Sequence, residues 1–376
     1  MKLHIVSFRF FLFLLILHTN ILFSQTTFPK PDHIVIAILE NHSFEQIIGS
    51  TAAPYINSLA NDTSSALFTA SYGITHPSQP NYLVLYSGST QGVTDDLVPV
   101  SNPFTTANLG SQLIDSGKTY ITYSEDLPQA GFNGELTGNY ARRHNPVTNW
   151  MGIGQNQVSP TINQPFTAFP SSNFTMLPTV CFVNPNTLND MHVGSDPSRI
   201  TAGDDWISNN LNNYIQWAKT NNSLFILTFD EDNDSTLNHI TTIFSGPMIL
   251  SGQYSTMLNH YSLLHTIEQI YGLPFIGDSL NYAPVSSCWK NPNSLNNIIK
   301  KDVSIYPNRA NNFFYVELSD YLEANAEIYN LKGELIQSNP LISNKTEINI
   351  DGLVSGFYMV KIKNKDGVFV RKFIKN

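Results

Sequence analysis

The sequence predicts an α/β protein, with an α/β/α sandwich around a mostly parallel central sheet and a small antiparallel β-sandwich after it. Two observations carry this prediction. Through the first 300 residues, apolar runs typical of buried strands alternate with helical patterns. From about residue 300 the chain changes to short alternating strands separated by polar turns. A length of 376 residues also favours two folded units over one.

Each expected element of the first part follows from its local pattern. The strands are apolar runs rich in β-branched and aromatic residues that end in polar or turn residues. We expect them at 33–41, 118–126, 178–185, 223–234 and 239–250. The helices have the spacing of amphipathic or buried helices, and we expect them at 53–62, 80–88, 203–220 and 260–272.

Other segments differ in composition from these elements. Two basic residues precede an apolar run, Phe10–Leu17, and small polar residues follow, which is typical of a secretory signal peptide over 1–24. The run is too short to span a bilayer comfortably, so we expect no stable membrane span. The main domain then covers 25–300 and the β-sandwich 301–376. Within the main domain, 132–173 is rich in Asn, Gly, Pro and Thr, which predicts a long loop over the functional edge of the sheet.

Charge and cysteine content narrow the function. Only 13% of residues are charged and the formal net charge is −9, so nucleic-acid binding is not expected. The part before residue 301 holds ten basic and twenty acidic side chains. An acidic domain that acts on an anionic substrate needs metal ions to reverse its local field. Cys181 and Cys288 would both enter an oxidising compartment after export, and the sequence leaves a disulfide between them open.

The stretch THPSQPNYLVLYSG places Ser78 just before an expected helix, because Pro80 is preset for a first helical turn. A hydroxyl there faces unpaired backbone N–H groups and the positive end of the helix dipole, which would also bind a phosphate. Ser78 could therefore be a nucleophile, activated by a coordinated metal ion. An ordinary helix cap is the alternative.

Polar residues follow two of the expected strands at the edge where ligands bind to parallel sheets. Glu40 and Asn41 leave the first strand and offer a carboxylate and an amide oxygen to a divalent cation. The alternative for this pair is that the two residues are merely polar groups at the surface or a helix cap. Asp190, His192 and Asp196 lie within seven residues after the third strand, and they could bind a metal ion or form a plain turn.

The segment TFDEDNDSTLNHI brings Asp230, Glu231 and Asp232 to a strand exit, with Asp234 and His239 after them. Four carboxylates within five positions repel one another unless water or cations neutralise them. A solvated calcium loop is the alternative, although the glycine and the closing glutamate of a helix-loop-helix calcium site are absent from the segment.

These groups all lie at strand exits or at the helix start beside them, which suits a serine nucleophile inside a carboxylate and histidine metal site. In order, the motifs ILENHSFEQIIG, THPSQPNYLVLYSG, YARRHNP, NDMHVGSDP, GDDW and LTFDEDNDSTLNHI resemble the phosphoesterase family of acid phosphatases and phospholipases C. This family belongs to the alkaline phosphatase superfamily. The resemblance covers residues 33–273 and implies an alkaline-phosphatase-like fold.

The resemblance also implies metal ligands. Ser78 stands where a threonine nucleophile precedes Pro-Asn in the nucleotide pyrophosphatases of the superfamily. One or two divalent ions are implied, and calcium, manganese, zinc and iron all suit carboxylate and histidine ligands. The implied ligands are Glu40, Asn41, Ser78, Asp230 and Glu231 for the first ion, and Asp190, His192 and His239 for a second.

Substrate contacts are implied in the same way. Asn81 belongs to the Pro-Asn segment, and Arg142 and Arg143 belong to YARRHNP, so these three are expected to bind the phosphate ester. His76 or His144 is expected to protonate the leaving group.

The last residues resemble a second family. SIYPN, EIYNLKGELI and INIDGLVSGFYMVKIKNKDGVFVRKFIKN are similar to the C-terminal sorting domain of Gram-negative type IX secretion. Arg309 stands where a second proline commonly follows Pro-Asn. The resemblance implies the type IX machinery as a partner and a secreted or cell-surface location.

We therefore expect a secreted, metal-dependent acid phosphatase that hydrolyses phosphate monoesters through a phosphoserine intermediate. The first alternative is a phospholipase C or another phosphodiesterase, which is less favoured because the catalytic part has no obvious added lipid-binding module. The second is a non-enzymatic surface protein whose acidic loops bind calcium, which does not explain Ser78 ahead of Pro80.

Overall fold

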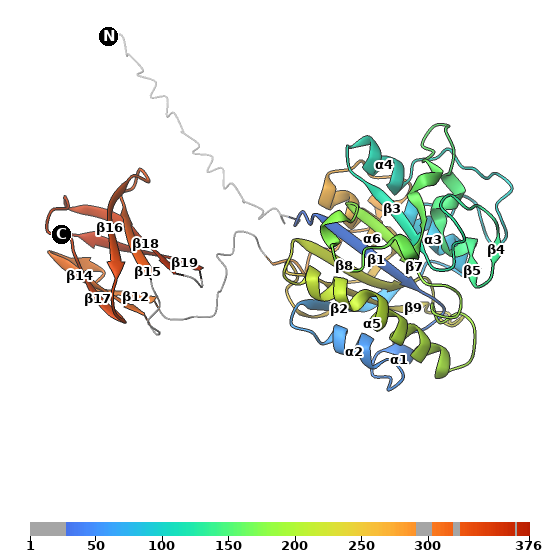
Figure 1. The fold of residues 1–376 in the computed structure, drawn as a ribbon, viewed down its shortest axis with the longest axis horizontal. Coiled ribbons are helices and arrows are strands. Elements are labelled where there is room, and N and C mark those ends of the chain that lie inside the picture. Colours follow the sequence, from blue (N-terminus) through green and yellow to red (C-terminus); the bar gives the residue numbers. More distant parts are fainter. Residues whose placement is uncertain (1–27, 291–302, 319–323, 365–366) are drawn as a thin grey trace, which may run out of the picture. The chain divides into compact units, whose positions relative to one another are not determined.

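The fold is described by a computed structural model that covers residues 28–290, 303–318, 324–364 and 367–376. The expected signal peptide and the expected domain boundary at residue 300 lie outside these residues. The chain divides after position 292 into two compact units, and each is described by itself (Figure 1).

A nine-stranded sheet forms the centre of the larger unit (Figure 1). Its strands lie in the order β10-β2-β9-β8-β1-β7-β3-β6, and β11 pairs with β2. Neighbouring strands are parallel, except that β9 is antiparallel to both β2 and β8. The strands are β1 His33–Leu39, β2 Ser65–Tyr72, β3 Tyr120–Ser124, β6 Asn163–Pro165, β7 Val180–Asn184, β8 Ser223–Phe229, β9 His239–Ser245, β10 Gly252–Tyr254 and β11 Leu258–Asn259.

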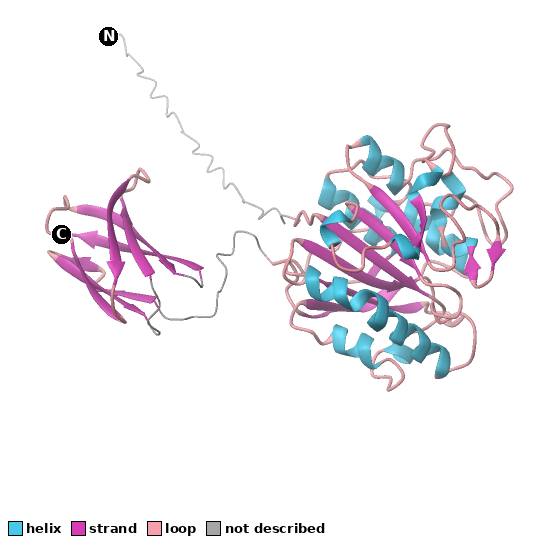
Figure 2. Cartoon of the chain, viewed as in Figure 1, coloured by secondary structure: helices cyan, strands magenta, loops and turns pink. Residues whose placement is uncertain are grey.

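Helices cover both faces of this sheet (Figure 2). The core on one face is built with α3, α4 and α6, and the core on the other face with α1, α2 and α5. Among the described residues, no helix is both long and apolar enough to cross a membrane. The helices are α1 Phe44–Ile47, α2 Pro54–Ala60, α3 Ser78–Ser87, α4 Leu109–Asp115, α5 Ser198–Ala218 and α6 His260–Tyr271.

The central strand β1 shows why the sequence takes this architecture. Successive side chains of a strand point to opposite faces. Ile34 and Ile36 therefore pack into the core on the α3 face, and Val35 and Ala37 into the core on the α5 face. A strand buried on both faces needs a continuous apolar run, which is what this segment provides.

The predicted fold class and the predicted elements of the larger unit are confirmed. The five expected strands form as β1, β3, β7, β8 and β9, and the four expected helices as α2, α3, α5 and α6. The strand β2 was not predicted, because its SALFTASY sequence mixes small polar residues with apolar ones. Helix α3 begins at Ser78 itself, two residues earlier than expected.

The expected long loop over 132–173 contains several short elements. One of them, β6, pairs with β3 and forms the edge of the central sheet. Trp150 and Tyr140 of this stretch are buried, which the polar composition did not indicate. The other elements are β4 Leu136–Thr137, β5 Tyr140–Ala141, and the 3₁₀ helices at Arg142–His144, Pro146–Trp150, Pro160–Ile162 and Phe166–Ala168. Two further 3₁₀ helices lie outside it, at Phe174–Met176 and Ser279–Asn281.

The smaller unit is the expected β-sandwich. One sheet has the order β12-β14-β17 and the other β13-β19-β18-β15-β16. All pairs are antiparallel except β13 with β19, and apolar side chains from both sheets form one core. A turn at 331–334 joins β15 to β16, with Gly333 at a φ of +81°. The strands are β12 Val303–Tyr306, β13 Arg309–Ala310, β14 Phe313–Leu318, β15 Ala324–Tyr329, β16 Leu335–Leu341, β17 Lys345–Asn349, β18 Gly356–Asn364 and β19 Gly367–Lys375.

The two cysteines do not form the disulfide that the sequence left open. Both thiols are free and buried. Cys181 packs in the core on the α5 face, whereas Cys288 packs in the core on the α3 face. The sheet therefore separates them.

A buried carboxyl on α6 gives the larger unit a pH-dependent stability. Glu268 accepts hydrogen bonds from the backbone N–H of Ile276 (3.0 Å) and from the hydroxyl of Ser279 (2.7 Å). Burial raises the pKa of Glu268 from 4.5 to about 7. The folded protein therefore holds this proton between pH 4.5 and 7, where the unfolded chain has released it.

We expect the stability that this group contributes at low pH to be lost as pH rises through 7, by about 1–3 kcal/mol. Glu268→Gln keeps the side-chain volume and removes the titration. Urea unfolding of the two proteins should therefore show the variant gaining stability relative to the wild type between pH 5 and pH 8. A stability difference that is the same at both pH values would contradict this prediction.

Candidate active site

The exits of three neighbouring strands meet at one edge of the sheet, as expected. Strand β1 lies between β7 and β8 and is parallel to both. The backbone N–H of Glu40 donates to the carbonyl of Asp190 (2.8 Å), and that of Asp230 donates to the carbonyl of Leu39 (3.0 Å). The acidic residues that end these strands are therefore held side by side by the backbone of the sheet.

Ser78 is the first residue of α3, and its hydroxyl faces carboxylates. The helix is capped at Pro77, and no side-chain cap bond is made there. Ser78 Oγ lies 3.1 Å from Glu40 Oε2 and 2.9 Å from Glu231 Oε1, and it donates to them. Ser78 is therefore not an ordinary helix cap, because its hydroxyl bonds to two carboxylates and not to the backbone of the first helical turn.

Three buried carboxyl groups surround this serine. Glu40, Asp230 and Glu231 are 0%, 1% and 3% exposed. Burial and the two neighbouring carboxylates raise the pKa of Asp230 well above its usual value, and burial raises the pKa of Glu231 to about 7. Burial alone would also raise the pKa of Glu40, but the imidazoles of His144 and His192 outweigh it and lower this pKa to about 2. Together, these three buried carboxyl groups favour the binding of protons or of a cation.

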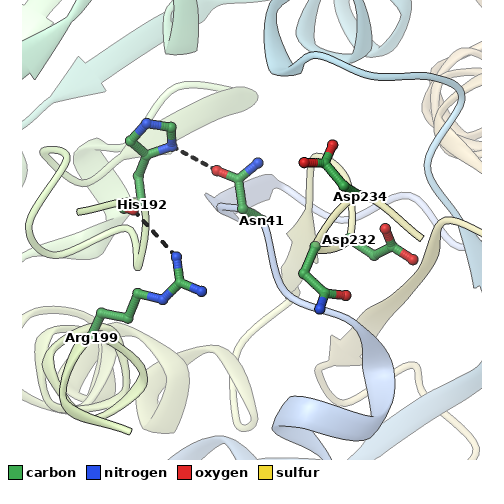
Figure 3. Close-up of a pocket in the computed structure, with 6 residues that line it drawn as sticks. Asn41, His192, Arg199, Asp232 and Asp234 are labelled. Atoms are coloured by element: carbon green, nitrogen blue, oxygen red, sulfur yellow. Dashed lines mark hydrogen bonds between the residues drawn. The ribbon is translucent and has the colours of Figure 1, made fainter. Parts of the chain in front are cut away.

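Asn41 lies at the centre of the site. Its φ of +48° is in the left-handed region, which asparagine tolerates better than most residues. Its backbone N–H donates to Asp230 Oδ1 (3.1 Å) and its Nδ2 donates to Glu231 Oε1 (2.8 Å). Its Oδ1 accepts from His192 Nδ1 (2.6 Å; Figure 3). Asn41 thus links the residues that follow β1, β7 and β8.

Two histidines complete the cluster. Ligand atoms of Glu40, His144 and His192 lie within 4.8 Å of one another. His144 Nδ1 is 3.0 Å from Asp190 Oδ2, and its Nε2 is 3.2 Å from Glu40 Oε1. His192 Nδ1 is 3.3 Å from Glu40 Oε2, and the hydrogen bond to Glu40 raises the pKa of His192.

The donor set of this cluster fits a divalent metal ion. Carboxylate oxygens, an amide oxygen and imidazole nitrogens converge, which is the chemistry that such ions select. Within the described residues, Asp230 Oδ2 is buried and has no hydrogen-bond partner. A buried acceptor without a partner is costly, and a cation would satisfy it.

His239 does not join Asp190 and His192 in a second ligand set. Its Nδ1 is 2.9 Å from Glu45 Oε1, and its Nε2 is 3.1 Å from the carbonyl of Thr69. Its ring also stacks on Phe44 at 4.8 Å. The imidazole of His239 therefore joins β9 to α1 and β2. The position beside Asp190 that we expected for His239 is occupied by His144.

The two arginines of YARRHNP separate. Arg142 is buried, with Nε donating to Asn133 Oδ1 (3.0 Å) and Nη2 to the carbonyl of Thr148 (3.3 Å), so it supports the 132–173 segment instead of reaching the site. Arg143 borders the site: its Nη2 is 3.3 Å from His192 Nε2.

Asn81 holds the chain ahead of the serine. Its Oδ1 accepts from the N–H groups of Ile74 (2.8 Å) and Thr75 (3.2 Å), and its Nδ2 donates to the carbonyl of Thr75 (2.7 Å). Its Nδ2 also lies 3.5 Å from Glu231 Oε2. Asn81 therefore positions the segment ahead of Ser78, and its expected contact with the substrate stays a prediction. His76 is partly exposed, and its Nδ1 lies 2.7 Å from Glu231 Oε2.

Tyr82 belongs to the site although it was not predicted from the sequence. Tyr82 donates its hydroxyl to Glu40 Oε1 (2.5 Å) and stacks on His144 at 5.5 Å. Burial and the Glu40 carboxylate raise the pKa of Tyr82 well above its usual value, so the hydroxyl remains a donor. Helical spacing could have found it, because Tyr82 lies four residues after Ser78 on the same face of α3.

Two buried histidines also support the site. His42 is fully buried, with Nδ1 2.8 Å from the carbonyl of Glu40 and Nε2 3.0 Å from Asp196 Oδ1. His260 donates from Nε2 to the carbonyl of Asp230 (2.6 Å), and burial lowers its pKa to about 4. Both bond to the backbone carbonyl of an acidic residue of the site. The sequence does not indicate this, because the direction of each ring depends on tertiary packing.

Comparisons with known proteins identify two families along the chain. Residues 50–274 match the model of the Phosphoesterase family, and residues 304–376 match the Secretion system C-terminal sorting domain. Glu40 and Asn41 lie just before the first matched range.

Curated relatives are phosphatases. A phosphatidylinositol-3-phosphatase of Mycobacterium tuberculosis is 44% identical over 71% of this chain and 85% of its own length. A phosphate-repressible acid phosphatase of Penicillium chrysogenum is 33% identical over 65% of this chain and 60% of its own. An acid phosphatase of Aspergillus fumigatus is 32% identical over 64% and 54%. The chain thus spans less than two thirds of the two fungal relatives.

Among solved structures, a protein of the alkaline phosphatase superfamily from Vibrio parahaemolyticus aligns with 92% of this chain and 80% of its own. The identity is 11% and the TM-score 0.47. From the matched domains and the relatives, the chain belongs to the phosphoesterase family: it is a hydrolase of phosphoric ester bonds that carries a type IX sorting domain and is secreted or displayed at the cell surface.

Proposed function

We propose that this protein is a metal-dependent phosphatase that hydrolyses phosphate monoesters through a phosphoserine on Ser78. The observation that carries the proposal is the position of Ser78 Oγ, at the start of a helix and within hydrogen-bond distance of Glu40 and Glu231. A neutral serine hydroxyl is a weak nucleophile, and enzymes usually activate it with an adjacent base or a coordinated metal ion.

A divalent ion in this site would be held by the buried carboxylates of Glu40, Asp230 and Glu231, with Asn41 beside them. His144 and His192 form a second possible ligand group, which shares Glu40 with the first. When bound, such an ion lowers the pKa of the serine hydroxyl and balances the negative charge of the phosphate. Carboxylates with imidazole suit calcium, manganese, zinc and iron, so the proposal covers one or two ions of these kinds.

The residues of the chain divide the remaining work. The Ser78 oxygen forms a bond to phosphorus while the bond from phosphorus to the alcohol breaks, and the serine proton passes to Glu231, whose Oε1 lies 2.9 Å away. The Ser78 oxygen takes this proton back when water hydrolyses the phosphoserine. Arg143, at the edge of the site, supplies hydrogen-bond donors to the phosphate oxygens. His76 gives a proton to the departing alcohol and regains one from the water that then hydrolyses the phosphoserine, since its ring is partly exposed and oriented by Glu231.

The names of the relatives favour monoesters over the phosphodiesterase alternative. The curated relatives above are named as phosphatases, and none of the three is named as a phospholipase C. The calcium-binding alternative fails on the family assignment, because a phosphoesterase domain accounts for 50–274. We also propose that the type IX machinery recognises the β-sandwich at 304–376.

Substrate preference and a trapped intermediate test the proposal together. The wild-type protein should hydrolyse p-nitrophenyl phosphate at least about tenfold faster, in kcat/KM, than bis-p-nitrophenyl phosphate or phosphatidylcholine. Acid quenching during turnover should leave one phosphoryl group on the peptide that contains Ser78, detected by mass spectrometry. Faster hydrolysis of the diesters would favour the phosphodiesterase, and an intermediate on another residue would contradict the assigned nucleophile.

A further inference from the structure

A pocket of about 340 Å³ opens beside the candidate active site (Figure 3). Among the described residues, those that line it are all polar or charged. Its walls come from three places in the chain: the exit of β1, the segment from β7 into α5, and the loop after β8. The lining residues are Asn41, His192, Arg199, Asp232, Asn233 and Asp234.

The floor of this pocket is one residue away from the nucleophile. Asn41 Nδ2 donates to Glu231 Oε1 (2.8 Å), and the same oxygen accepts from Ser78 Oγ (2.9 Å). Asn41 thus links the pocket to Ser78 through one carboxylate oxygen, and we take the pocket as the place toward which the alcohol part of a phosphate ester at Ser78 extends.

Arg199 forms one wall and is held in place before any ligand binds. Its Nε donates to Asp196 Oδ1 (2.7 Å), and its Nη1 donates to the carbonyl of His192 (3.4 Å; Figure 3). Asp196 is itself anchored by His42 Nε2 (3.0 Å) and by Gln46 Nε2 (3.1 Å). A guanidinium has five N–H donors, and two are used here, so three remain for a ligand. Asp196 thus acts as the anchor of this arginine.

The opposite wall offers two carboxylates, Asp232 and Asp234, which differ in whether their oxygens already accept hydrogen bonds. Asp232 is buried and already bonded, because it accepts from the N–H and hydroxyl of Ser235 and from the N–H of His239. Asp234 is free to meet a ligand: its side chain is 91% exposed, with one oxygen 3.6 Å from His76 Nδ1.

The chemistry of the two walls selects one class of leaving group. A hydroxyl group both donates and accepts, so a polyhydroxylated alcohol can bond to Arg199 and Asp234 at once. A second anionic group would be repelled by Asp234, and an aryl or alkyl group would cover polar atoms without bonding to them. The pocket volume, at the lower end of ligand pockets, suits a single sugar or cyclitol ring.

We propose that this pocket is the leaving-group site and that Arg199 selects phosphate monoesters of polyhydroxylated alcohols. The proposal rests on the proposed phosphomonoesterase function. Asp196 is a positioning residue, because it acts through the arginine that it holds.

The test compares kcat/KM for glucose 6-phosphate with kcat/KM for phenyl phosphate in the wild type and in Arg199→Met. The intrinsic difference between the two leaving groups cancels when the ratio is compared between proteins. Loss of hydrogen bonds from a charged donor should lower this selectivity ratio about tenfold in Arg199→Met. Asp196→Asn should lower it less, because the arginine remains but is held more loosely.

A matched control removes a cation from the other end of the same helix. Lys219 follows α5 and pairs with Asp62 (2.7 Å), outside the pocket, so Lys219→Met should keep the wild-type ratio. An equal loss on both substrates in Arg199→Met would show a merely structural role and overturn the proposal. An unchanged ratio would overturn it as well.

Binding separates this proposal from the proposed function. In a Ser78→Ala background, calorimetry should show glucose 6-phosphate bound about tenfold more weakly when Arg199→Met is added. Normal binding of glucose 6-phosphate in the double variant would reject the role of Arg199, whatever the turnover. A wild type that binds the sugar phosphate through Arg199 but hydrolyses no monoester would leave the pocket assigned and reject the phosphatase instead.

Discussion

Replacement of Ser78 by alanine is expected to lower the hydrolysis of p-nitrophenyl phosphate by at least about 10³-fold, because the phosphoserine can then no longer form. The side chain removed is small and sits at the first position of α3, where it makes no cap bond, so the fold should be kept. The change should fall on kcat, with circular dichroism and thermal unfolding close to those of the wild type.

The other end of the same helix provides the control. Ser87 closes α3 and donates to the carbonyls of Leu83 (2.8 Å) and Ser89 (3.1 Å). Ser87→Ala should leave kcat near the wild-type value. Undiminished turnover in Ser78→Ala would rule out the serine as nucleophile, whereas equal losses in both variants would point to damage of the helix.

Removal of bound metal is the second change expected to have a large effect. Exhaustive chelation should abolish monoester hydrolysis, because Glu40, Asp230 and Glu231 then repel one another around Ser78 or retain protons in place of the ion. Adding calcium, manganese, zinc and iron(II) back one at a time should restore it with the ion that fits. Activity and elemental analysis on the same samples measure this.

Thermal unfolding gives a second readout of the same change. An ion that binds only the folded protein stabilises it by mass action, by about 2.7 kcal/mol at a free concentration one hundred times its Kd. The restoring ion should therefore also raise the melting temperature of the chelated protein. Full activity after chelation, with elemental analysis finding no metal, would exclude a metal-dependent reaction.

The arrangement of the site was predictable because it depends on strand exits. Glu40 and Asp230 end strands that a continuous apolar run identifies, and parallel neighbours bring their ends to one edge. The position of Ser78 was predictable for a similar reason, since Pro80 indicates a helix start. In these cases the backbone decides where the side chain lies.

The failures concern side chains whose direction depends on distant packing. His239 begins β9 as the acidic segment suggests, yet its ring turns to Glu45 and Phe44, which lie far away in the sequence. Arg142 and Arg143 are adjacent and look equivalent, but Arg142 is buried within the 132–173 segment and Arg143 borders the site. Local pattern cannot separate two such residues, because the segment that contains them has no periodicity that would indicate which side chain is buried.

The order β7-β1-β8 at the middle of the sheet determines where insertions in the chain can be tolerated. Neighbouring strands lie about 4.8 Å apart whatever connects them, so the spacing of the acidic residues is set by the ladder of backbone hydrogen bonds. The segments that join β1 to β7 and β7 to β8 can therefore gain or lose whole insertions without moving Glu40 relative to Asp230. Large insertions in these connections should thus be tolerated far better than a one-residue shift in the register of β1.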